Sequence, residues 1–116
     1  MVLNGRDLDP GEVFADSRIT LTDLARENEL VVVADCAYMT TGEGLHRFVD
    51  PVDGETYLYS QFEVADARRV FAVFEQPDLK ATFSFTVTAP EHWQVISNSP
   101  TPSPEKADDG AATWSF

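Results

Sequence analysis

Residues that bind transition metals are scarce in this sequence. Its 116 residues include one cysteine, Cys36, and two histidines, His46 and His92. A single cysteine excludes an intrachain disulfide, and the histidines are far apart, with neither HExxH spacing nor a CxxC partner. We therefore predict that the chain itself holds no metal ion and no other cofactor.

Positive charge is scarce as well. Eight Lys and Arg side chains stand against twenty Asp and Glu, which gives a formal net charge of -12. Such a field repels the phosphates of nucleic acids and of anionic membrane surfaces. We expect neither nucleic acid nor membrane among the partners.

Long apolar runs are missing. The sequence contains no run of about 18 apolar residues and no basic segment followed by an apolar one, so it predicts neither a membrane-spanning helix nor a signal peptide. We expect Cys36 to be a small buried hydrophobe. Because Cys36 is unpaired and no signal segment is present, we expect the parent protein to be cytoplasmic. A segment cut from the middle of a domain would lack a signal in any case.

The apolar runs that are present are short, rich in β-branched and aromatic residues, and separated by Gly, Pro, Asn and Asp, as in an all-β protein. Asn4-Gly5 predicts a two-residue hairpin turn, and Asp9-Pro10-Gly11 predicts a second turn. We predict one domain over 1–116, with a long connection at 40–57 and a mobile loop rich in Pro, Ser and Asp at 99–112. The predicted strands are 1–3, 18–21, 29–39, 55–63, 81–89, 93–98 and 113–116.

The segment after residue 56 combines a predicted strand with a predicted helix. By the two-residue period of a strand, Gln61 and Glu63 share one face. A short helix over 65–74 follows, because Pro77 forbids its continuation. Taken from the residues alone, Glu63 is a solvent-facing strand glutamate.

Two adjacent arginines lie in this predicted helix. Arg69 is placed to pair with Asp66 or Asp78 and so to brace the junction between strand and helix. We interpret Arg68 and Arg69 as structural residues.

Motifs of the common hydrolases and nucleotide-binding proteins are missing. The sequence has no GxSxG motif and no glycine-rich phosphate loop. A carboxylate pair such as Glu43 with Glu63 could serve as acid and base, but pairs of this kind arise by chance among twenty acidic residues.

A resemblance adds what composition leaves open. The segment 57–90 resembles the N-terminal domain of the M1 family of zinc aminopeptidases, of the aminopeptidase N type, and 27–63 is similar to its actinobacterial members. The matching motifs are Gln61-Phe62-Glu63, Ala67-Arg68-Arg69, and F-x-x-F-[DE]-x-P-D-x-K-A-x-F at 71–83. Ala72 departs from this pattern where proline is common, and Glu75-Gln76 departs where Asp-Glu is common.

The resemblance implies a fold and a larger parent protein. It predicts part of a saddle-shaped β-sandwich, with further strands before and after this segment, which caps a catalytic zinc domain. The family's HExxH helix and GxMEN loop are not in this sequence, so we expect zinc in the full-length enzyme and a catalytically silent fragment. Open sheet edges would then favour self-association with another copy.

The resemblance also assigns the candidate site. It places Glu63 where a side chain anchors the free α-amino group of a peptide substrate, and Gln61 where the first side-chain pocket is lined. Two other classes stay open: a stand-alone acidic β-sandwich that binds a protein or a glycan, and a small hydrolase with a carboxylate pair.

Overall fold

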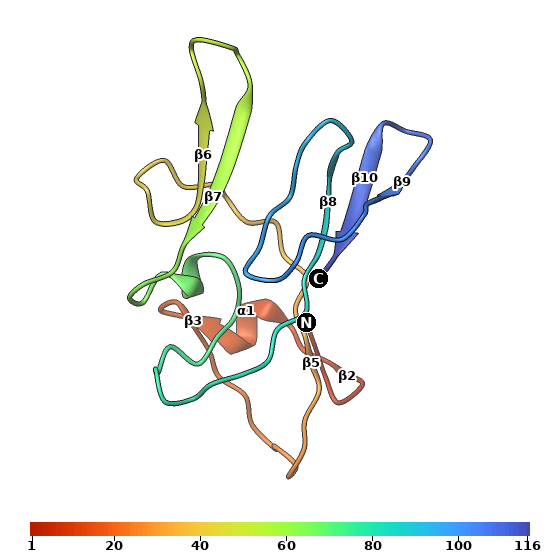
Figure 1. The fold of residues 1–116 in the computed structure, drawn as a ribbon. Coiled ribbons are helices and arrows are strands. Elements are labelled where there is room, and N and C mark those ends of the chain that lie inside the picture. Colours follow the sequence, from red (N-terminus) through yellow and green to blue (C-terminus); the bar gives the residue numbers. More distant parts are fainter. The chain divides into compact units, whose positions relative to one another are not determined.

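The computed structural model describes all residues, Met1–Phe116 (Figure 1). The chain divides into two compact units, Met1–Pro77 and Asp78–Phe116, which are described one at a time. Short strands and irregular segments make up most of both units, and helical structure is confined to single short turns in the first unit, so the all-β prediction is confirmed. None of the helices has the length or the apolar character needed to cross a bilayer.

The first unit begins with a three-stranded sheet in the order β2-β1-β5. Its strands are β1 (Val2–Leu3), β2 (Arg6–Asp7) and β5 (Leu30–Val31), all paired antiparallel. Asn4 and Gly5 have φ values of 52° and 78°, which confirms the predicted hairpin turn. The Asn4 side chain also accepts a hydrogen bond from the Glu29 backbone N–H at 2.8 Å, so the turn residue links β1 to the segment before β5.

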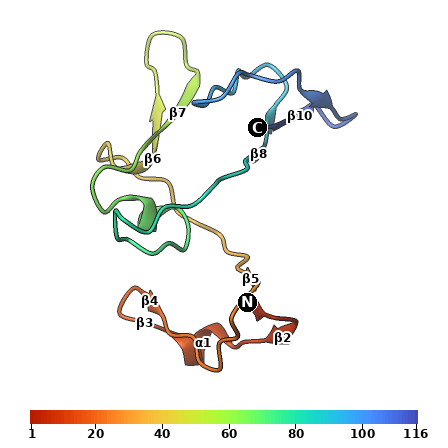
Figure 2. The ribbon, with the colours of Figure 1, turned by 60° about the horizontal axis from the view of Figure 1, so that its bottom comes forward.

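A short helix and a small hairpin follow the first two strands (Figure 2). The helix α1 (Pro10–Val13) precedes β3 (Phe14–Ala15) and β4 (Arg18–Ile19), which pair antiparallel. Asp9 caps the helix by accepting a hydrogen bond from the Gly11 N–H at 2.8 Å, and Pro10 suits the first helical position. The predicted turn at Asp9-Pro10-Gly11 is therefore the start of one helical turn.

The longest hairpin of the first unit joins β6 (Gly44–Val49) and β7 (Thr56–Gln61). The prediction of a long connection over 40–57 was wrong, because 44–49 form a strand and only 50–55 form the hairpin loop. The predicted helix over 65–74 was also too long: one 3₁₀ turn, η1 (Ala67–Arg69), is present.

The second unit contains the sheet β8-β10-β9. Its strands are β8 (Thr86–Pro90), β9 (Glu105–Lys106) and β10 (Ala111–Ser115), and Trp114 lies opposite Val87. The predicted strand at 93–98 is absent, the one at 81–89 is shorter and lies later, and the predicted loop at 99–112 contains β9. Ala112 and Trp114, 0% and 3% exposed, are the buried apolar side chains of this sheet.

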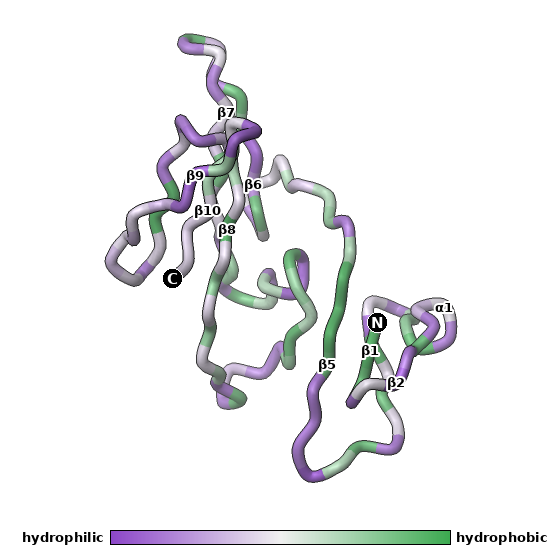
Figure 3. Tube along the Cα trace, turned by 90° about the vertical axis from the view of Figure 1, so that its right-hand side faces the viewer, coloured by the Kyte–Doolittle hydropathy of each residue, from purple (hydrophilic) through white to green (hydrophobic).

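Much of the apolar surface of the first unit is open to solvent. The predicted strand at 29–39 is a strand only at β5, and the apolar residues continue beyond it (Figure 3). Val33 is 88% exposed, and Cys36 is also exposed, contrary to prediction, because the residues around them pair with no strand. In this unit Leu3 is the large side chain that is fully buried.

Candidate functional site

Gln61 is the last residue of β7. Its partner across the hairpin is Gly44, the first residue of β6. The exposed Gln61 side chain turns onto the following backbone, where its Nε2 donates to the Glu63 carbonyl oxygen at 3.1 Å. This hydrogen bond links the end of β7 to Glu63, the other candidate substrate-binding residue.

The sequence predicted Glu63 on a strand face, and this prediction was wrong: β7 ends at Gln61, and Glu63 lies in the turn that follows. The strand ends because the chain reverses here: the Asp66 N–H donates to the Phe62 carbonyl at 3.2 Å, and Ala65 has a φ of 71°. The peptide bond between Glu63 and Val64 is cis. Glu63 thus lies within a loop that the hydrogen bond between Asp66 and Phe62 closes.

The rings of Phe62 and Phe71 pack together beside this turn. Their centroids are 5.5 Å apart in an edge-to-face arrangement, and both side chains are half-buried. Such a pair contributes about 0.5–1.5 kcal/mol beyond the area that it buries. It holds the residue before Glu63 against the segment after η1.

Arg69 connects the turn to the start of β6. Its Nε lies 2.7 Å from Asp66 Oδ1, which confirms one of the two predicted partners, and its Nη2 lies 3.4 Å from Glu43 Oε2. The hydrogen bond with Asp66 and, next, the charge of Glu43 raise the pKa of Arg69 above its usual value. Sequence reasoning missed the contact with Glu43, because the two residues are not close in the chain.

Of the acidic side chains around this turn, some form hydrogen bonds or ion pairs within the protein and one does not. Glu43 and Asp66 are both held by Arg69, and Glu43 also accepts from the Thr41 hydroxyl at 3.2 Å. Glu63 is exposed, and no hydrogen bond or ion pair within the first unit engages its carboxylate. Of these three acids, Glu63 is the one available to an external cation.

His46 has a local structural role in the same hairpin. Its Nδ1 accepts a hydrogen bond from the Gly42 N–H at 3.0 Å, and its ring lies on that of Tyr59 with 4.8 Å between centroids. No three His, Cys, Asp or Glu side chains converge in a way that could hold a metal ion.

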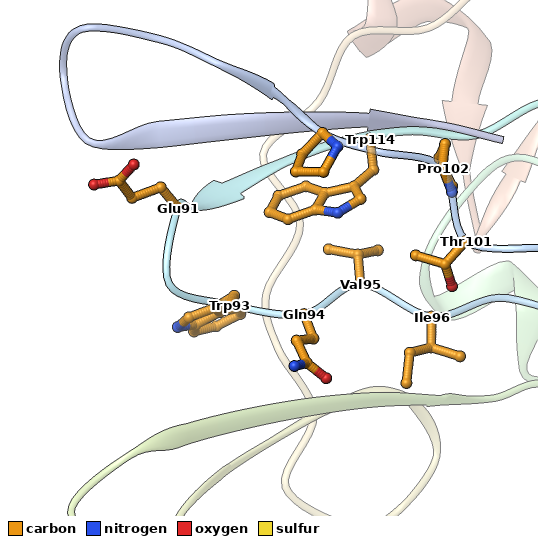
Figure 4. Close-up of a pocket in the computed structure, with 9 residues that line it drawn as sticks. Glu91, Trp93, Gln94, Val95, Ile96, Thr101, Pro102 and Trp114 are labelled. Carbon is orange, nitrogen blue, oxygen red and sulfur yellow. The ribbon is translucent and has the colours of Figure 1, made fainter.

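A separate groove of about 400 Å³ lies in the second unit. Trp114 points from β10 toward Val95 on the facing segment, and Trp93, Ile96 and Pro102 complete the apolar lining (Figure 4). Residues 93–96, part of the segment that we predicted as a strand, form one wall of this groove.

Comparison with known proteins agrees with the motifs around this turn. The family model described as "Peptidase M1 N-terminal domain" matches residues 25–116. The chain is 72% identical over 106 residues to an aminopeptidase N of Streptomyces lividans, which covers 90% of this chain and 12% of that protein.

More distant relatives carry related names. An aminopeptidase N of Acetobacter pasteurianus is 51% identical over 49 residues, which is 40% of this chain and 14% of that protein. A human glutamyl aminopeptidase is 38% identical over 68 residues, which is 57% of this chain and 7% of that protein. The chain thus spans only a small part of the length of the curated relatives that it matches.

Proposed function

The chain belongs to the N-terminal domain family of the M1 peptidases, and from that membership we propose that it is the substrate-docking part of a zinc aminopeptidase. In this role it binds the free amino terminus of a peptide, while a catalytic domain of the same parent chain cleaves the first peptide bond. The substrates are peptides with an unblocked terminus.

The observation that carries this proposal is the exposed, unengaged carboxylate of Glu63, on a turn that one backbone hydrogen bond closes and one hydrogen bond from the Gln61 side chain supports. An aminopeptidase must recognise a charged terminus, which an internal peptide bond does not have. A carboxylate held in place accepts hydrogen bonds from an ammonium group, each contributing about 1.5–3 kcal/mol. Glu63 is therefore suited to bind the α-ammonium group of the substrate, so that the first peptide bond is the one cleaved.

Gln61 is proposed to line the pocket for the first side chain. Its exposed position at the end of β7, two residues before Glu63, supports this assignment. Its amide is oriented by the hydrogen bond to the Glu63 carbonyl, so the two side chains would act as one surface.

Zinc in the parent enzyme would be held by residues outside this chain, because the side chains present here do not form a ligand set. Such an ion would polarise the scissile carbonyl and supply an activated water. The chain alone is proposed to be catalytically silent. Metal analysis after dialysis, with an aminoacyl-anilide assay of the purified chain, tests this: turnover that follows the chain through purification would contradict it.

The catalytic domain is also the proposed partner of the exposed apolar side chains. Val33, Val52 and Phe74 are 88%, 92% and 82% exposed, and burying these side chains against a catalytic domain would remove apolar surface from water. The parent chain supplies the simplest cover for it.

The substitution Glu63→Ala in the full-length parent tests the docking role. We expect kcat/KM on free-amine substrates to fall by roughly ten- to a hundredfold, while the stability changes by less than about 0.5 kcal/mol. Glu27→Ala, which removes an exposed carboxylate from the loop before β5, is the matched control. Unchanged kcat/KM in a folded Glu63→Ala enzyme would overturn the proposal.

A further inference from the structure

We propose that Arg69 is a positioning residue for peptide binding: by pairing with Asp66 and Glu43, it fixes the turn that carries Glu63 against the start of β6. This inference rests on the proposed function, because it takes Glu63 as the residue that binds the substrate amine. It adds a residue that touches neither the substrate nor the reacting atoms.

The geometry makes Arg69 a bridge between two segments. One guanidinium nitrogen, Nε, contacts Asp66 at 2.7 Å, and another, Nη2, contacts Glu43 at 3.4 Å. The Asp66 side chain is only 14% exposed, whereas those of Arg69 and Glu43 are 37% and 46% exposed. The contact with Asp66 is therefore the better shielded one, and the contact with Glu43 is weakened more by solvent and salt.

The backbone at Gly44 brings the bridge close to the strands. Gly44 is buried, has a φ of 63°, and a Cβ at this position would lie 3.0 Å from the Cβ of Arg69. Gly44 is also the register partner of Gln61. The start of β6 thus packs closely on the Arg69 side chain, and the end of β7 pairs with β6 at the same residue.

The bridge acts on the residue whose backbone closes the turn. The Asp66 N–H donates to the Phe62 carbonyl, so Glu63 lies inside the loop that this hydrogen bond closes. Fixing the Asp66 side chain through Arg69 therefore restricts the loop that presents Glu63. A carboxylate that must meet an ammonium group at a fixed depth loses effectiveness when its position varies by as little as about 1 Å.

Arg69 also determines which carboxylates of the site are paired within the protein. It engages Glu43 and Asp66 and leaves Glu63 unengaged. Without Arg69, the carboxylates of Glu43 and Asp66 would lose the cation that they share and would repel one another, and either could compete for the substrate cation. Arg69 therefore selects which acid receives the ammonium group.

A double-mutant cycle in the full-length parent tests this inference. Arg69→Gln, Glu63→Ala and the double variant are compared by kcat/KM on an alanyl-anilide, with thermal unfolding recorded for each. If Arg69 works through Glu63, Arg69→Gln lowers kcat/KM by roughly tenfold in the wild type but by less than about twofold when Glu63 is already alanine. Arg69→Lys, which keeps the charge, is expected to recover part of the loss.

Arg68→Gln is the matched control. Arg68 carries the same charge one residue earlier, and its side chain takes no part in the bridge. We expect this variant to keep kcat/KM within about twofold of the wild type. Should Arg69→Gln fail to fold, Glu43→Gln replaces it in the cycle, since it removes only the exposed arm of the bridge.

The outcomes separate the two proposals. Losses from Arg69→Gln and Glu63→Ala that simply multiply in the double variant, or an Arg69→Gln enzyme as active as the wild type, overturn the positioning role while the docking role stands. A Glu63→Ala enzyme with full activity overturns the docking role, and the positioning role with it.

Discussion

The side-chain amide of Gln61 donates a hydrogen bond to the backbone carbonyl of Glu63, with 3.1 Å between Nε2 and the oxygen. The two residues to which the family resemblance assigns substrate binding are thus directly joined. The Gln61 side chain therefore supports the turn through this hydrogen bond, and the same side chain is proposed to line the pocket for the first substrate side chain.

Replacing Gln61 by glutamate tests this link. Gln61→Glu puts an acceptor against the Glu63 carbonyl where the wild type has a donor, so we expect the turn to open more often. Amide hydrogen exchange of Asp66, whose N–H closes the turn, should become faster by roughly tenfold. Ser60→Ala, one residue earlier on the exposed end of β7, is the control, and equal exchange rates in all three proteins would contradict the link.

Alanine substitutions at two glycines with positive φ, Gly5 and Gly44, distinguish the cost of backbone strain from the cost of close packing. Gly5→Ala meets no atom within 4 Å, so it should cost only the left-handed conformation, about 1–2 kcal/mol. Gly44→Ala adds a contact of 3.0 Å with the Arg69 Cβ, and should cost about 2–4 kcal/mol. Urea unfolding of both variants measures the difference, and equal losses would show that Arg69 does not pack closely on Gly44.

The hairpin loop between β6 and β7 should respond to pH at both extremes. Asp53 accepts hydrogen bonds from the Glu55 N–H and from the Tyr57 hydroxyl, each at 2.8 Å, and these lower its pKa below the usual value. The bond to Asp53 raises the pKa of Tyr57. The contribution of Asp53 to stability is therefore lost as pH falls through its lowered pKa, and that of Tyr57 is lost as pH rises through its raised pKa.

Tyr57→Phe checks the cause of this response. The pKa of Asp53 should rise but stay below its usual value, because the stronger contribution of the Glu55 N–H remains. A carbon-detected NMR titration of the Asp53 carboxyl measures it. An unchanged pKa would mean that the tyrosine hydroxyl does not hold the carboxylate.

The second unit should depend strongly on Trp114. This side chain is 3% exposed and lies opposite Val87 in the sheet. We expect Trp114→Ala to lower the stability of this unit by about 3–5 kcal/mol. Trp93→Ala, at a half-buried tryptophan on the same groove, should cost less, and the opposite order in chemical denaturation would contradict this packing.

Local chemistry predicted some of these elements well. The Asn4-Gly5 hairpin depends on two residues that favour positive φ, and the structure has both. The strand β6 was missed because Gly42, Gly44 and Pro51 interrupt the pattern on either side of it. These residues mark the ends of the strand and the hairpin loop, so the same breakers are compatible with a hairpin and with an irregular connection.

In the candidate site, too, local contacts could be predicted from the sequence and contacts between distant segments could not. The pairing of Arg69 with Asp66 follows from a spacing of three residues, which the sequence displays directly. Its pairing with Glu43 depends on how the start of β6 meets η1, and no local period encodes that contact. For the same reason the predicted helix over 65–74 shortened to η1, since the Phe62–Phe71 contact and the turn at Glu63 override the helical pattern.

The most direct test of the docking role varies the substrate as well as the enzyme. Values of kcat/KM are measured for the full-length parent and its Glu63→Ala variant on one peptide with a free terminus and on the same peptide acetylated at that terminus. The account predicts that the substitution lowers kcat/KM on the free-amine peptide by roughly ten- to a hundredfold and changes the value for the acetylated peptide much less, because only the free amine carries the charge that Glu63 binds. An equal fall on both peptides, or no fall on either, would contradict it.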